Sequence, residues 1–92
     1  MSGELPKPDD GEVRRAFGKV LRRLRESRYW TQDELAERTD SSQNYISHLE
    51  RGLKGPSLIR VFELARALGV SPEEFVAEVN REARKGIGTT KA

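Results

Sequence analysis

Apolar residues recur along the chain at intervals of three and four, the spacing that places side chains on one face of an α-helix. The first such run follows Asp9 and Asp10, and either of these residues can cap a helix. Its apolar members are Val13, Phe17, Val20, Leu21 and Leu24. A first helix with one buried face is therefore expected after this acidic pair.

Two short helices are expected next, each marked by its capping residue. Thr31 and Glu34 have the spacing of a capping box, which predicts a helix over residues 32–38. A polar stretch then interrupts the pattern. Ser42 is placed to cap a third helix, and Gly52 supplies the left-handed residue at which that helix ends.

Two further helices complete the chain. Pro56-Ser57 predicts the start of a fourth, which Gly69 ends, and "SPEE" from Ser71 is a strong start for a fifth. We expect the fifth helix to fray after Lys85. The apolar positions on these helices are Leu58, Val61, Leu64, Ala65, Leu68, Phe75, Val76 and Val79. The residues expected in the core are Leu35, Ala36, Ile46, Leu49, Leu58 and Leu64.

The expected fold is all-α, because no alternating run of β-branched residues competes with the five helices. A chain of 92 residues supports one modest core. Residues 11–85 are accordingly assigned to a single domain. Residues 1–10, with two prolines and no apolar period, are expected to be a flexible N-terminal arm, and residues 86–92 a flexible C-terminal tail.

Composition excludes several classes of protein. The chain has no cysteine and one histidine, which excludes disulfides and the usual zinc sites. No apolar run approaches the roughly 18 residues of a membrane span, and no signal-peptide core follows Met1, so a cytoplasmic location is expected. Ser47 and His48 are adjacent on a helix and lack an orienting third group, so they form no catalytic pair. We therefore expect that the protein is not an enzyme and that it binds no cofactor and no metal ion.

Charge is uneven along the chain. The formal net charge is only +2, yet residues 11–28 hold seven basic residues against two acidic ones. A local basic field favours a polyanionic partner such as nucleic acid. A solvated helix face is the plainer alternative, and this run alone does not decide between them.

The third predicted helix, within "SSQNYISHLERG", divides into two faces. At about 100° per residue, an arc centred opposite the apolar residues holds only hydrogen-bonding groups. Those groups belong to Gln43, Asn44, Ser47, His48 and Arg51. Asn and Gln amides can pair with adenine N6 and N7, and Ser can donate or accept, so this face suits the edges of bases. The capped helix, the short turn and this helix together have the spacing of a helix-turn-helix.

From Phe17 to Phe75 the chain resembles the lambda-repressor-like, Cro/C1-type (XRE) helix-turn-helix family. The resemblance is carried by "LRRLRESR", "TQDELAERT", "YISHLERG", "PSL" and "ELARALGVSPEEF". Within the family, "YISHLERGLKGPSL" is similar to controller proteins of restriction–modification systems and to small phage regulators. The resemblance implies a five-helix fold that binds double-stranded operator DNA as a homodimer and regulates transcription.

The resemblance also implies roles for individual residues. The expected base-reading residues are Ser42, Gln43, Asn44, Ser47 and His48. The expected phosphate contacts are Gln32, Arg51 and Lys54, with backbone amides near residues 53–55. Arg25 and Glu50 are expected to form a structural ion pair between the first and third helices. Val76 and Val79 of the fifth helix are the candidate dimer interface.

Three residues depart from the family pattern. Asp40 and Tyr29 stand where the family commonly has glycine, and Ser41 stands where it commonly has an apolar residue. Trp30 is expected to fill the junction of the first two helices. Two alternative functions stay open: an antitoxin-type regulator that holds a toxin, and a protein-interaction module. RNA polymerase is a further candidate protein partner.

Overall fold

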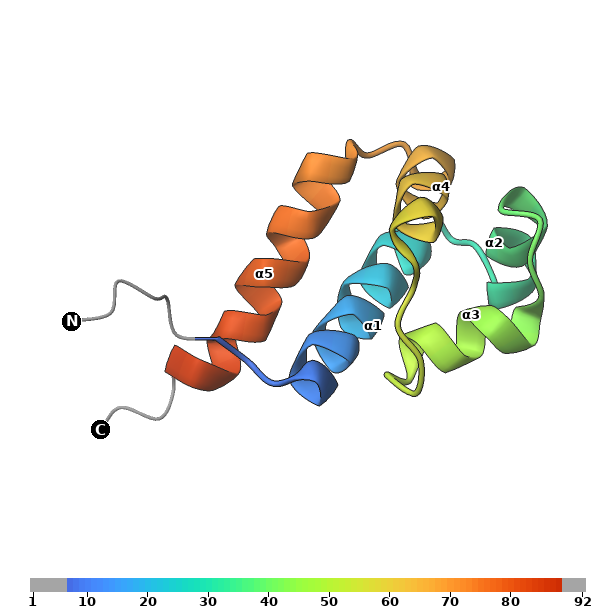
Figure 1. Cartoon of the computed structure of the whole chain (residues 1–92). Helices are drawn as coiled ribbons and strands as arrows, with labels where there is room; N and C mark the ends of the chain where they lie inside the picture. The colour runs from blue at the N-terminus through green and yellow to red at the C-terminus, as the bar shows by residue number, and fades with distance from the viewer. Residues whose placement is uncertain (1–6, 89–92) are drawn as a thin grey trace.

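The structure is a computed structural model that describes residues 7–88, and this range contains five α-helices and no strand (Figure 1). The helices are α1 (Asp10–Glu26), α2 (Gln32–Arg38), α3 (Gln43–Glu50), α4 (Leu58–Leu68) and α5 (Pro72–Gly88). The expected all-α, five-helix fold is confirmed. Residues 1–6 of the predicted arm and 89–92 of the predicted tail lie outside the described residues.

Local capping fixes where each helix begins. Asp9 and Thr31 each form a reciprocal capping box with the glutamate three residues later. Ser42, Ser57 and Ser71 each accept a hydrogen bond from the amide N–H three residues ahead, at 3.0, 3.1 and 3.0 Å. These side chains satisfy amides that have no partner inside the helix. The sequence therefore locates all five starts, and Asp9 caps α1.

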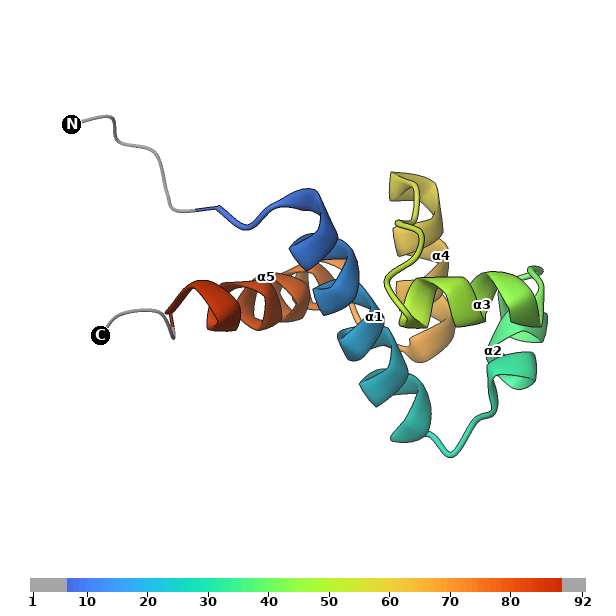
Figure 2. The same ribbon diagram turned by 90° about the horizontal axis from the view of Figure 1, so that it is seen from below.

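α1 is the central helix. It packs against α5 on one side and against α3 on the other, while α2 packs on α3 and α4 on α5 (Figure 1, Figure 2). The rings of Phe17 and Phe75 join α1 to α5, with their centroids 5.2 Å apart. The large side chains with the least exposure are Val20, Leu21, Leu35, Ile46, Leu49, Leu64, Leu68 and Phe75. α3 thus contributes only Ile46 and Leu49 to the buried core.

α1 and α3 approach each other closely at Gly18. A Cβ atom placed there would lie 2.4 Å from the carbonyl oxygen of Glu50 and 2.5 Å from that of Leu49. Both oxygens belong to the backbone of α3, so neither can rotate away. Gly18 makes α1 less stable as a helix by about 1 kcal/mol. Its missing side chain is nevertheless required, because only glycine lets α3 pack this closely against α1.

The α1–α2 junction is closed by Trp30, as expected. Its ring packs against the core, and the Arg38 guanidinium carbon lies 4.0 Å from the ring centroid. Tyr29 precedes it with a φ of 58° and a side chain that is 94% exposed. Its backbone thus adopts the left-handed conformation that explains the glycine of the family pattern.

One expectation about the core is wrong. Leu58 is 71% exposed rather than in the core, because it is the first residue of α4 and the packed stripe begins one turn later at Val61. α5 extends to Gly88, three residues beyond Lys85. At residues 82 and 83 the helix is held to α1, since Ala83 is buried and Glu82 forms ion pairs with α1 side chains.

No helix in the described range combines the length and the apolar character that a membrane span requires.

Candidate nucleic-acid interface

The polar face of α3 lies at the surface. Ser42, Gln43 and Asn44 are exposed, and Ser47 and His48 are half-buried. The Ser42 hydroxyl caps the helix by accepting a hydrogen bond from the Tyr45 amide. The Asn44 side chain makes no hydrogen bond within residues 7–88. The five residues expected to read bases are thus brought together on one accessible surface.

Gln43 is held by a second glutamine. Its Nε2 donates to Oε1 of Gln32 at 2.6 Å, and Nε2 of Gln32 donates to Oε1 of Glu50 at 3.0 Å. The Gln32 side chain, expected to contact phosphate, is therefore occupied on both sides by protein groups. The side-chain oxygen Oε1 of Gln43 has no partner in the described part of the chain. α2 thus orients an acceptor on the outer surface of α3.

Arg25 and Glu50 form the expected ion pair between α1 and α3. Arg25 Nε and Nη2 donate to the two Glu50 oxygens at 2.6 and 2.9 Å, and Nη1 donates to the Trp30 carbonyl at 2.7 Å. The two side chains are only 10% and 4% exposed. The hydrogen bond to Glu50 raises the pKa of Arg25 although burial lowers it, so the guanidinium remains charged.

The turn between α2 and α3 keeps its shape despite its departures from the family pattern. Asp40 occupies the left-handed region with a φ of 52°. The Ser41 amide donates to the Ala36 carbonyl at 2.9 Å, and the hydroxyls of Ser41 and Thr39 lie 2.9 Å apart. Arg60 of α4 donates to the Thr39 carbonyl at 2.8 Å. Hydrogen bonds therefore replace the apolar contact that Ser41 cannot make.

The loop after α3 carries positive charge and free backbone donors. Arg51 is exposed, and its Nη1 lies 3.5 Å from Ser47 Oγ. The Lys54 ammonium lies 5.7 Å from the centroid of the Tyr45 ring, which draws it toward α3. The Leu53 amide donates to the His48 carbonyl at 3.0 Å. Of the three amides expected to face phosphate, only those of Lys54 and Gly55 have no partner within the described range.

The two residues of the expected dimer interface on α5 differ in exposure. Val76 is 52% exposed, but Val79 packs against the core and is only partly accessible. α4 also exposes three large apolar side chains, Leu58, Ile59 and Phe62, at 71%, 70% and 53%. The sequence gives a signal for them, because Ile59 and Phe62 fall off the buried period of α4 and are still apolar.

The residues described here contain no group of three or more His, Asp or Glu side chains able to hold a metal ion.

Comparison with known proteins agrees with this geometry. A helix-turn-helix family model matches residues 21–75 of the chain. The chain belongs to this Cro/C1-type helix-turn-helix family. It is therefore a DNA-binding transcriptional regulator, and the expectation that it is no enzyme agrees with the non-enzymatic character of the family.

Three relatives define the resemblance more closely. The uncharacterized HTH-type transcriptional regulator y4dJ of Sinorhizobium fredii is 45% identical over 65 residues, which cover 71% of this chain and 84% of that protein. The control protein C.BamHI of Bacillus amyloliquefaciens is 35% identical over 65 residues, covering 70% and 80%. The crystal structure of the clp gene regulator ClgR from Corynebacterium glutamicum superposes with a TM-score of 0.79 at 32% identity, covering 91% and 86%. The expected similarity to controller proteins is confirmed.

Proposed function

We propose that this regulator binds a two-fold symmetric operator as a homodimer, with α3 of each subunit in a major groove. The observation that carries the proposal is the outward face of α3, which is accessible and made of hydrogen-bonding groups. Two subunits would read half-sites about 34 Å apart, one helical turn of DNA. Ser42, Gln43, Asn44, Ser47 and His48 are the proposed base-reading residues.

Gln43 and Asn44 have the most specific chemistry on this face. The Gln32 contact fixes the Gln43 amide and leaves its carbonyl oxygen as an acceptor for an amino group on a base edge. Adenine N6 and cytosine N4 offer such groups in the major groove. Asn44 retains both its donor and its acceptor and is able to pair with adenine N6 and N7. Arg51, Lys54 and the amides of residues 54 and 55 are the proposed phosphate contacts.

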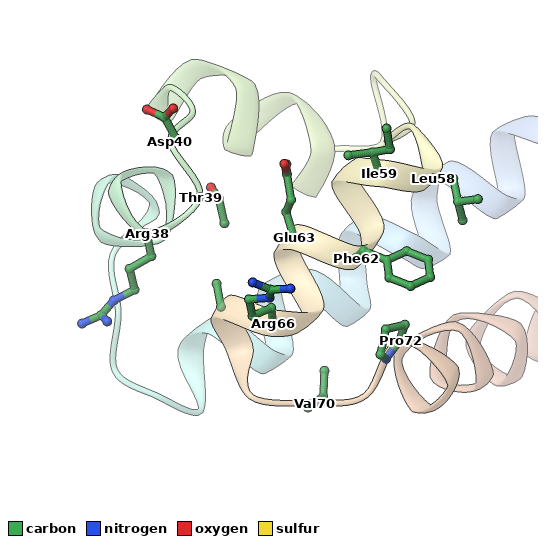
Figure 3. Close-up of a pocket in the computed structure, with 11 residues that line it drawn as sticks. Arg38, Thr39, Asp40, Leu58, Ile59, Phe62, Glu63, Arg66, Val70 and Pro72 are labelled. Atoms are coloured by element: carbon green, nitrogen blue, oxygen red, sulfur yellow. The ribbon is translucent and has the colours of Figure 1, made fainter.

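The proposed dimer interface is the apolar face of α4, joined by Val76 of α5. Leu58, Ile59 and Phe62 line a hollow of about 710 Å³ that runs from the α2–α3 turn to the start of α5 (Figure 3). Pro72 lies at its far end, and Val76 follows one turn later on the same face of α5. Val79, the other residue expected at the interface, is partly buried against the core and lies at the edge of this face.

A second copy of this chain is the proposed occupant of the hollow. Arg38, Asp40, Glu63 and Arg66 surround the apolar centre, so its border carries both signs of charge. A two-fold contact brings a patch against itself, and a border of mixed sign offers each cation an anion on the other copy. A single module of this size contacts too little DNA for high specificity, which a second subunit supplies.

Selection of bound sequences from random duplexes tests the base-reading face. Gln43→Ala and Asn44→Ala are each expected to lose preference at particular positions of the selected motif, whereas Asn80→Ala, an exposed amide on α5, should retain the wild-type motif. Each lost pairing should reduce discrimination by about 1–3 kcal/mol. An unchanged motif in both α3 variants would exclude this face as the reading surface.

Sedimentation equilibrium tests the interface. Phe62→Glu is expected to give a monomer, because a carboxylate would be buried against the apolar face of the second copy. Val13→Glu, another exposed apolar position, on α1, is the matched control and should leave the association state unchanged. A Phe62→Glu protein that still forms dimers and still binds both half-sites would refute the α4 interface.

A further inference from the structure

We infer that Arg14 and Arg15 of α1 form a second phosphate-binding surface on DNA, beside the α3–α4 loop. The inference rests on the proposed function, since it requires α3 to be seated in the major groove. It assigns to α1 a direct contact with the sugar–phosphate backbone, in addition to its structural role as the central helix. No base is read by these two residues.

The first observation is a division among the basic residues of α1 and the turn that follows it. Four of the seven form ion pairs with carboxylates: Lys19, Arg22, Arg23 and Arg25. Arg28 donates to the Leu24 carbonyl. Within residues 7–88, Arg14 and Arg15 have no carboxylate within the 4.0 Å of an ion pair. Four of the seven cations are therefore paired with carboxylates, and of the three that are not, Arg14 and Arg15 are adjacent while Arg28 is held at the far end of the helix by backbone oxygen.

The second observation is where these two side chains lie. A Cβ atom at Gly55 would be 3.5 Å from Cγ of Arg14, and one at Gly52 would be 2.8 Å from Cγ of Arg15. The stems of both arginines therefore lie directly against the α3–α4 loop. Their guanidinium groups turn toward Gly11, where a Cβ would meet Arg15 Nη1 at 3.2 Å, the Asp9 carboxylate oxygen Oδ1 at 3.5 Å and Arg14 Nη2 at 3.7 Å. The two charges thus lie close together, next to the loop proposed to contact phosphate.

The third observation is the side of the molecule on which this pair lies. The start of α1 lies at the lower edge of Figure 1, beside the end of α3 and the loop, and both face the viewer from below in Figure 2. Arg51 and Lys54 add two further positive charges there. DNA contacted by the loop would thus pass the start of α1.

The acidic residues at the start of α1 do not remove this charge. Asp9 accepts from the Glu12 amide at 2.7 Å, and Glu12 accepts from the Asp9 amide at 2.9 Å. Both carboxylates are thus directed at backbone N–H groups of the helix start, where they offset the positive end of the helix dipole. Asp10 is the remaining exposed acid. The partner that fits two adjacent guanidinium groups beside a basic loop is a phosphate diester.

The salt dependence of operator binding tests the inference. Each phosphate contact contributes about 0.9 to the slope of log affinity against log salt. The double variant Arg14→Ala, Arg15→Ala is expected to reduce that slope by about 1–2 and to retain the wild-type motif in random-duplex selection. Arg22→Ala on the same helix, whose charge is paired with Glu26, should leave the slope unchanged.

Two further measurements separate charge from packing. The pair Arg14→Lys, Arg15→Lys keeps the charges and should restore the slope, and phosphate-ethylation interference should show contacts that are lost only in the alanine double variant. An alanine double variant with the wild-type slope, or a lysine pair that fails to restore it, would overturn the inference and leave the proposed function standing. Wild-type binding that is insensitive to salt would overturn both.

Discussion

Replacing Gly18 with alanine is expected to destabilise the protein, although alanine is the better helix former. Helix propensity alone predicts a gain of about 1 kcal/mol. The structure opposes it, because the new methyl group would lie 2.4 and 2.5 Å from two carbonyl oxygens of α3. Restoring ordinary contact would require α1 and α3 to separate by about 1 Å.

The magnitude follows from which atoms collide. Overpacking a core costs about 1–3 kcal/mol, and a site where backbone must move belongs at the upper end of that range. Subtracting the propensity gain leaves a net loss of about 1–2 kcal/mol. For a domain of this size that loss lowers the thermal midpoint by about 5–15 °C.

Urea unfolding of Gly18→Ala beside Gly11→Ala measures the effect. Gly11 is on the same helix, but its nearest neighbour is the far end of the Arg15 side chain at 3.2 Å, which is free to rotate. Gly11→Ala is therefore expected to be stabilised, by at most about 1 kcal/mol. A Gly18→Ala protein as stable as the wild type would show that α3 is not seated on the bare backbone of α1.

Three other perturbations have defined outcomes. Glu50→Ala should lower the free energy of unfolding by about 3–5 kcal/mol, because it strands the nearly buried Arg25 charge; a loss below about 1 kcal/mol in urea unfolding would indicate an ordinary surface pair. Tyr29→Gly should stabilise by about 1 kcal/mol, since it relieves a left-handed backbone and removes a ring that is 94% exposed; a lower thermal midpoint would contradict this. Burial raises the pKa of Glu82, but its hydrogen bond to Lys85 and the neighbouring cations together lower the pKa by more than burial raises it. The net pKa of Glu82 therefore lies below its ordinary 4.5. The resulting stability is present above that pH and is lost as the pH falls through the folded pKa, so Glu82→Gln should flatten the acid dependence of thermal melts below about pH 5.

Features fixed by local chemistry could be predicted from the sequence. The capping residues Thr31 and Ser42 act within one turn of chain, so their spacing determines where α2 and α3 begin. The same holds for the left-handed residues Gly52 and Gly69, with φ values of 74° and 75°. The polar face of α3 was also predictable, because helical periodicity assigns directions before any neighbour is known.

Features fixed by contacts between helices could not be predicted in the same way. Periodicity places Leu58 on the apolar side of α4, but only the packed structure shows that the helix projects past its neighbours at that residue. The sequence shows that Gly18 weakens its helix, but it does not show the α3 carbonyl oxygens that leave no room for a side chain at this position. It likewise gives the basic run of α1 without showing which cations are already paired, so Arg14 and Arg15 were not distinguished from the rest.

The hydrogen-bonded series Arg25, Glu50, Gln32 and Gln43 joins the interior of the protein to its outer surface. If Gln43 reads a base as proposed, a mutation that changes target preference there also releases the Gln32 amide, which is bonded to the carboxylate that joins α3 to α1. Asn44 has no such tether in the described chain, so it is free to vary without disturbing the scaffold. Divergence of operator choice among descendants of this regulator should therefore begin at Asn44 and reach Gln43 only together with a compensating change at Gln32.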